Sequence, residues 1–185
     1  RLQQRVHALV RNLSNAETRQ EAAAEINLLV SHTTAAHAIV AQMRIEPQLA
    51  DLLLLEPVPE SFKHCLICIL SQCASHRESR ERQARCATQA LCTLIKQKTL
   101  PPHVLHAATL HLAALTRSVS CQRVIAADYP ALKRLDEIED SAKHMWQSHL
   151  GSAGFATITQ ESARYARWAL RTARGRHRKP IFAQA

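Results

Sequence analysis

Apolar residues recur at helical spacing through nearly the whole chain. In the segment TRQEAAAEINLLVSH, residues 18–32, four of them fall on one side of an α-helix, namely Ala22, Ile26, Leu29 and Val30. The same spacing returns in residues 61–76, 103–118 and 161–174. Each stripe predicts a helix that buries one face against the rest of the protein.

These four segments also repeat one another. Equivalent places in them are taken by Ile26, Leu70, Leu112 and Leu170, at intervals of 44, 42 and 58 residues. Intervals of about 40–47 residues are typical of solenoids with two or three helices per repeat. The longer last interval contains residues 144–160, which hold two of the three glycines, and we interpret these residues as a connector or an insertion.

The composition favours helices and leaves little material for strands. Only three glycines occur in 185 residues, aromatic residues make up 4%, and runs of β-branched or aromatic residues at period two are missing. The predicted fold class is all-α. No apolar run approaches the roughly 18–20 residues of a membrane span. The chain opens RLQQRVHALV without a hydrophobic signal segment, so we expect a processed mature protein or a piece of a larger one.

Two stretches between these segments run as a short helix, a turn, and a second helix that begins at a proline, Pro47 in one and Pro130 in the other. Together with VIAADYPALKRL (residues 124–135) and YARWAL (residues 165–170), they resemble the armadillo family of helical repeats, and less closely the related HEAT type. The resemblance implies a right-handed α-solenoid of about three to four armadillo-like repeats. It divides the chain into armadillo-like repeats (residues 1–143), the connector or insertion (residues 144–160), and a C-terminal repeat helix with a basic tail (residues 161–185).

The chain departs from the armadillo pattern in several places. The glycine of the turn is replaced by Met43 in one repeat and by Ala127 in another, so we expect an altered turn. The middle repeat is expected to fuse its short helices into one, residues 79–97. In the peptide-binding members, a ladder of asparagines and tryptophans lines the groove. Here only Trp168 fills a tryptophan position, and the asparagine positions hold Leu28, Gln72, Ala114 and Thr172. Capture of an extended peptide in the importin manner is therefore not expected.

Candidate catalytic and metal-ligating residues are few. The motif HCLIC places His64, Cys65 and Cys68 together, but a structural zinc site needs four ligands and no second C-x-x-C exists. His103 and His106 lack the glutamate of a metalloprotease helix. No nucleophile elbow, phosphate loop, dinucleotide fingerprint or pair of catalytic carboxylates is found. We therefore expect a protein that is not an enzyme and has no catalytic residues, metal, cofactor or small-molecule substrate.

The positions of the cysteines indicate in which cellular compartment the protein works. All six cysteines lie inside helical patterns, which indicates reduced thiols and an intracellular, reducing compartment, either the cytoplasm or the mitochondrial matrix. A basic compartment such as the matrix would also be one explanation for the net charge of +9; acidic partners are the other.

The main functional signal is a row of cations near the end of the chain. Steps of three and four residues place five arginines on one helical stripe, followed by a lysine: Arg164, Arg167, Arg171, Arg174, Arg178 and Lys179. Tyr165 and Trp168 fall on the opposite side, which is expected to be buried, and the only nearby acid is Glu161. Repulsion within the stripe is therefore uncompensated along its own helix. We predict a docking surface for an acidic partner; the alternative is the solvated face of a last helix.

These observations predict a non-catalytic helical-repeat interaction module that serves as a structural subunit or adaptor of a larger intracellular or organellar complex. Its partner would be an acidic protein surface within a multi-subunit assembly, clamped by the arginine stripe. The alternative is a helical-repeat protein that binds the phosphate backbone of RNA or DNA, for example in an organellar ribonucleoprotein. The net charge favours this alternative, and the scarcity of aromatic residues for base stacking speaks against it.

Overall fold

The computed structural model of the chain describes residues 1–148, 161–162 and 164–171. Within these residues every regular element is an α-helix and no strand occurs, so the all-α prediction is confirmed. The helices are α1 (Leu2–Asn12), α2 (Arg19–His32), α3 (Thr34–Gln42), α4 (Glu46–Leu53), α5 (Glu60–Cys73), α6 (Arg77–Ile95), α7 (Pro102–Leu115), α8 (Val119–Ala127) and α9 (Tyr129–Ser148). Residues 161–162 and 164–171 are also helical, and we call them the terminal helix.

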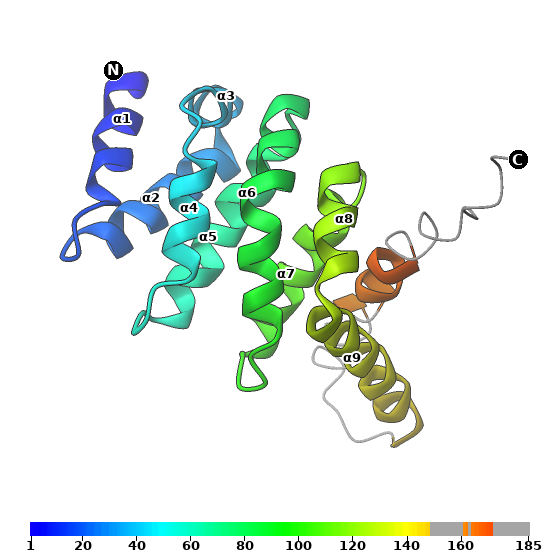
Figure 1. The fold of residues 1–185 in the computed structure, drawn as a ribbon. Coiled ribbons are helices and arrows are strands. Elements are labelled where there is room, and N and C mark those ends of the chain that lie inside the picture. Colours follow the sequence, from blue (N-terminus) through cyan, green and yellow to red (C-terminus); the bar gives the residue numbers. More distant parts are fainter. Residues whose placement is uncertain (149–160, 163, 172–185) are drawn as a thin grey trace, which may run out of the picture.

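The helices lie in two rows (Figure 1). One row contains α2, α5 and α7, with α2 against α5 and α5 against α7. The other row contains α4, α6 and α8, with α4 against α6 and α6 against α8, and α9 packs on α6 and α8. Contacts of α4 with α5 and of α6 with α7 join the two rows. The rows therefore grow in chain order from α1, which packs on α2 and α3, to α9 at the opposite end.

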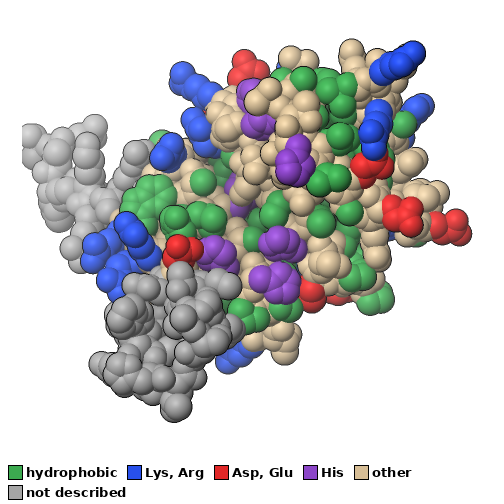
Figure 2. All heavy atoms as spheres, turned by 180° about the vertical axis from the view of Figure 1, so that it is seen from behind, with side chains coloured by type: hydrophobic (Ala, Val, Ile, Leu, Met, Phe, Trp, Pro, Cys, Tyr) green, Lys and Arg blue, Asp and Glu red, His purple; other side chains and the backbone are tan. Residues whose placement is uncertain are grey.

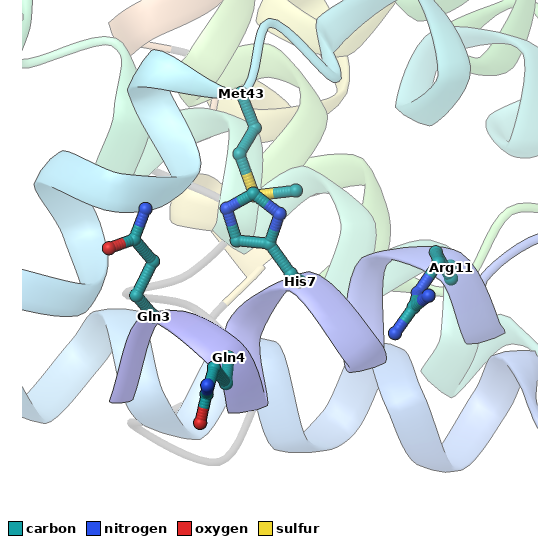
Figure 3. Close-up of a pocket in the computed structure, with 5 residues that line it drawn as sticks. All are labelled: Gln3, Gln4, His7, Arg11 and Met43. Atoms are coloured by element: carbon teal, nitrogen blue, oxygen red, sulfur yellow. The ribbon is translucent and has the colours of Figure 1, made fainter. Parts of the chain in front are cut away.

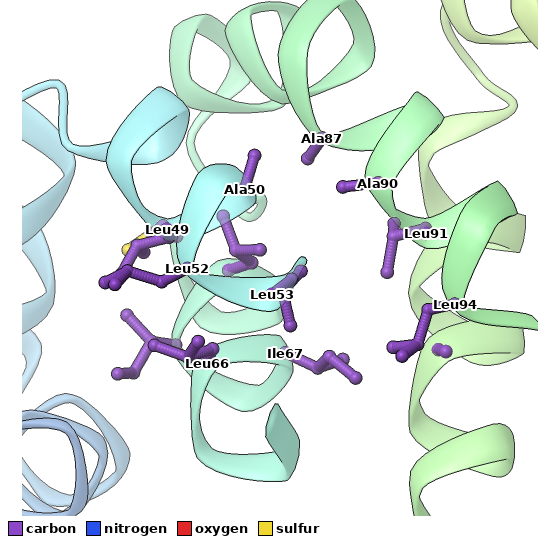
Figure 4. Packing of buried hydrophobic residues seen from close by; sticks show 14 of the residues in the cluster. Leu49, Ala50, Leu52, Leu53, Leu66, Ile67, Ala87, Ala90, Leu91 and Leu94 are labelled. Carbon is purple, nitrogen blue, oxygen red and sulfur yellow. The ribbon is translucent and has the colours of Figure 1, made fainter. Parts of the chain in front are cut away.

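Aliphatic side chains fill the space between the rows. Leu53 of α4, Ile67 of α5 and Leu94 of α6 point into the same layer (Figure 4), and all three are almost fully buried. Burial of each such side chain stabilises the fold by about 1.5–3 kcal/mol. Ala50 of α4 and Ala87 of α6 are small enough to let these two helices approach each other closely. The array is thus held by one continuous core.

Several predicted boundaries can be compared with the structure. α7 begins at Pro102, where proline suits the first turn because the missing N–H has no partner within a helix there. The predicted fusion of two short helices is confirmed by α6, a single helix of 19 residues. α9 continues through Ser148, so the first residues of the predicted connector are helical, and residues 149–160 lie outside the described part of the chain. The division of the chain at residues 143 and 160 stays a prediction.

The turn after α3 contains an unusual residue. α3 ends at Gln42, Met43 keeps a right-handed helical conformation, and Arg44 has a φ of 55°. The left-handed position that glycine usually takes is therefore occupied by Arg44 and not by Met43, the position where the sequence comparison placed the missing glycine. A non-glycine residue in this conformation costs about 1–2 kcal/mol.

Candidate partner-binding groove

The structure covers half of the predicted arginine stripe. Arg164, Arg167 and Arg171 lie on the terminal helix, whereas the other predicted docking residues, Arg174, Arg178 and Lys179, lie outside the described residues. Arg164 and Arg171 are exposed and Arg167 is half-buried. Since seven residues make about two helical turns, Arg164 and Arg171 project from the same side of the terminal helix.

Arg167 has a partner that sequence reasoning missed. Its Nε lies 2.8 Å from Oε1 of Glu139 on α9, and the Glu139 carboxylate is largely buried. This ion pair joins the terminal helix to α9, so the charge of Arg167 is already matched within the protein. By contrast, neither Arg164 nor Arg171 forms an ion pair with any residue that the structure describes. The described half of the stripe thus combines one structural arginine with two that form no ion pair with another described residue.

Arg164 lines a groove between α7 and the terminal helix. The groove has a volume of about 410 Å³ and is lined by Leu110, Ala113, Ala114, Arg117, Arg164, Tyr165 and Trp168. Arg117 is exposed and follows the end of α7. Two guanidinium groups from separate parts of the chain therefore face one groove with an otherwise apolar and aromatic lining. No carboxylate is among the lining residues in the described part of the chain.

Trp168 does not lie where the sequence predicted. It was expected on the buried side of the terminal helix, but its side chain is 42% exposed and lines the same groove as Arg164. Tyr165 is half-buried, and Ala169 takes the fully buried position. The expectation was wrong because Trp168 and Arg164 are four residues apart, and residues at this spacing are neighbours on a helix surface.

Arg117 is a candidate binding residue that the sequence analysis did not single out. A signal for it was present: Arg117 lies one helical turn after Ala114, one of the positions that match the asparagine ladder. Ala114 and Trp168, both at ladder positions, do line the groove. Leu28 and Gln72, which were matched to the same ladder, do not line this groove, so the correspondence with the ladder stays a prediction.

Histidines gather on one face of the described structure, and Figure 2 shows several of them near its middle. His106 of α7 shares a hydrogen bond of 2.8 Å with the Ser162 hydroxyl and lies 3.7 Å from a carboxylate oxygen of Glu161, which fixes the start of the terminal helix on α7. The ring centroids of His64 and His103 are 5.4 Å apart. Burial, followed by the charges of neighbouring histidines, lowers the pKa of His64, so this ring is held neutral near pH 7.

The HCLIC motif brings the side chains of His64 and Cys68 together. Cys68 Sγ lies 3.8 Å from a His64 ring nitrogen, and burial raises the pKa of both Cys65 and Cys68, which keeps them as thiols. None of the six cysteines forms a disulfide bond. Among the described residues, no three His, Cys, Asp or Glu side chains meet in positions that could hold a metal ion.

A further groove, of about 430 Å³, lies between α1 and the end of α3 (Figure 3). In it the side chains of His7 and Met43 point toward each other, and Gln3, Gln4 and Arg11 complete the lining. With a single arginine and two amides, this groove gathers no charge comparable to that of the groove at the terminal helix.

None of the helices in the described residues combines the length and the apolar character that a membrane crossing requires. Comparison with known proteins finds no family model, curated protein or solved structure that matches the chain.

Proposed function

We propose that the protein is a non-catalytic helical-repeat interaction module, an armadillo-like α-solenoid that serves as a structural subunit or adaptor and holds an acidic segment of a partner protein. One observation carries this proposal. Arg117 and Arg164 belong to separate parts of the chain and line the same groove, whose other lining residues are apolar or aromatic.

The arrangement of the helices supports the solenoid part of the proposal. The rows α2, α5, α7 and α4, α6, α8 add helices in chain order, and each new helix packs on the one before it in its row. A solenoid grows in this way because each repeat buries its apolar face only against its neighbours. Such an array offers an extended surface for a partner and has no single enclosed active site.

The lining of the groove favours an acidic ligand with an apolar neighbour. A guanidinium group binds a carboxylate through two parallel hydrogen bonds. Because the described lining has no carboxylate of its own, an incoming acid meets Arg117 and Arg164 without competition. Leu110 and Trp168 can then pack on an aliphatic or aromatic side chain beside that acid. The preferred ligand is therefore a short segment in which acidic and apolar residues lie next to each other.

The proposal can be tested by selecting ligands from a random peptide library with the intact protein and measuring the affinity of the selected peptides. The test variant is Arg117→Gln/Arg164→Gln. The matched control is Arg85→Gln/Arg123→Gln, which removes the same charge from two exposed arginines that do not line the groove. Since an exposed ion pair contributes about 0.2–1 kcal/mol, and more when it is bidentate, we expect the test variant to bind about tenfold more weakly and the control to bind normally.

Other results would contradict the proposal. If the selected peptides lack acidic residues, or if both double variants lose affinity equally, the groove is not the docking site. If the selection yields nothing and the protein instead binds a single-stranded RNA probe with an affinity that falls steeply with salt, the nucleic-acid alternative would be correct.

A further inference from the structure

A second charged groove lies between α3 and the beginning of α6, away from the terminal helix. Its volume is about 420 Å³, and three arginines line it: Arg44 in the turn after α3, Arg77 at the first position of α6, and Arg82 five residues further along α6. Glu78 is its one acidic lining residue among those that the structure describes. Three guanidinium groups around one groove of this size call for an explanation beyond solubility.

Arg82 forms a fixed wall of the groove. Its Nη2 donates to Oε1 of Glu46 at 2.8 Å and to the Ala41 carbonyl oxygen at 2.7 Å, and its Nε lies 3.2 Å from both Glu46 oxygens. Glu46 is only 2% exposed and also accepts a hydrogen bond of 2.6 Å from the Ser79 hydroxyl. The charges of Arg82 and Glu46 therefore balance each other, and this pair holds the start of α6 against α3 and α4.

Arg44 and Arg77 remain available to a ligand. Both are exposed, and neither forms an ion pair with another residue in the described part of the chain. The opposing charge is that of Glu78, which is 90% exposed and lies 4.0 Å from Nη1 of Arg82. Because it is loosely held at the rim, Glu78 can turn into solvent when an anion enters. When the Glu78 carboxylate has turned away, Arg44 and Arg77 remain as two unmatched cations beside the fixed Arg82.

The backbone around the groove adds to this positive character. Arg44 is kept at a left-handed position where glycine would relieve strain, so the chain retains a cation there at a cost in stability. His76 precedes α6 but makes no side-chain hydrogen bond to its first turn; its ring instead packs against His37, with ring centroids 4.7 Å apart. The first turn of α6 thus has no side-chain cap, and residues 76–79 at this end of the helix line the groove. The uncapped start of α6 therefore adds to the positive character that the arginines give the groove.

We propose that the groove between α3 and α6 binds a phosphate monoester group on a partner protein, such as a phosphoserine, through Arg44 and Arg77. A phosphate monoester carries close to two negative charges near pH 7 and three acceptor oxygens, which match two unpaired guanidinium groups. A single carboxylate would leave one of the two cations unmatched. A nucleic-acid backbone would require a longer row of cations, whereas these two lie at one groove.

The direct test is a titration of isotope-labelled protein with the peptide acetyl-Ala-phosphoSer-Ala-amide, followed by amide NMR spectra. We expect saturable shifts at the start of α6 and no shifts with the unphosphorylated peptide. Arg44→Gln and Arg77→Gln should each weaken binding about tenfold, since hydrogen bonds to charged groups are the stronger ones. Glu78→Gln should strengthen binding about twofold to fivefold, because it removes the competing carboxylate.

Arg85→Gln is the matched control, since Arg85 is an exposed arginine further along α6 that does not line the groove. It should leave the affinity unchanged, and so should Arg117→Gln/Arg164→Gln, because this site is independent of the groove at the terminal helix. The proposal is overturned if the phosphopeptide causes no saturable shift, if the unphosphorylated peptide binds as well, or if Arg85→Gln weakens binding as much as Arg77→Gln. The spectra of the free variants show whether each one is folded.

Discussion

His111 of α7 gives the sharpest test of the packing. Its side chain is 1% exposed, and neither ring nitrogen has a hydrogen-bond partner in the described structure. Burial lowers the pKa of His111 from 6.5 to about 4. Between these two values the unfolded chain binds a proton at this position and the native protein does not. Stability must therefore fall as the pH drops from about 6.5 towards 4.

The size of this effect follows from the two pKa values. For a histidine that titrates near 6.5 in the unfolded state and near 4 in the native state, lowering the pH from 7 to 5 costs about 2 kcal/mol of unfolding free energy. The assay is urea unfolding of the wild type and of His111→Leu at both pH values. Because all other titrating groups are shared, the difference between the two proteins isolates His111. We expect the wild type to lose about 2 kcal/mol more than the variant.

His111→Leu should also be more stable than the wild type at pH 7, because it removes two buried polar atoms that lack partners, each of which costs about 1–3 kcal/mol. Equal pH dependence of the two proteins would refute the reasoning, since it would mean that the His111 ring reaches water or a partner in solution. A variant that is less stable at pH 7 would mean that the ring nitrogens are satisfied.

Two further predictions concern the groove between α3 and α6. Arg82→Met leaves the buried Glu46 carboxylate without its cation and should lower the free energy of unfolding, measured in urea, by about 3–5 kcal/mol. Glu46→Met should lower it by less, because Arg82 is 24% exposed and can reach water. A larger loss for Glu46→Met than for Arg82→Met would contradict this account. Arg44→Gly should raise the unfolding free energy by about 0.5–1 kcal/mol, the relieved strain less the backbone entropy of glycine, while it weakens phosphopeptide binding. Arg44→Ala keeps the strained backbone, so a glycine variant that is less stable than the alanine variant by about 0.5–1 kcal/mol, the backbone entropy of glycine alone, would show that no strain is present.

The helices could be predicted because their signal is local. Apolar residues at helical spacing predicted segments at residues 61–76 and 103–118, and the structure has α5 at Glu60–Cys73 and α7 at Pro102–Leu115. The sequence also contains Pro101 and Pro102 at the start of α7, where proline suits the first turn, whereas further inside a helix it would remove a hydrogen bond. Buried stripes and prolines act within a few residues of themselves, so one sequence is enough to detect them.

The candidate sites depend on contacts that such patterns do not contain. Arg167 was grouped with its neighbours because Glu161 is the only acid near it in sequence, whereas its partner Glu139 lies 28 residues earlier on another helix. Arg44 and Arg77 are 33 residues apart and meet at one groove only because α3 packs near the beginning of α6. Which charges meet is decided by the packing of the rows, and the periodicity of a single helix says nothing about this.

The two proposed grooves together suggest how such a protein would gain specificity. Each offers two exposed arginines at the surface, and contacts of this kind are individually weak. α6 lines one groove and packs directly on α7, which lines the other, so the continuous core fixes the distance between them. Consider a partner that carries an acidic segment and a phosphorylated residue at the matching separation. Once one of these features occupies its groove, the other is held near the remaining groove at a high effective concentration. A partner with only one of the two would bind weakly. The choice of partner would then depend on the spacing between two anionic features, because the rigid rows of helices keep the two grooves at a fixed separation.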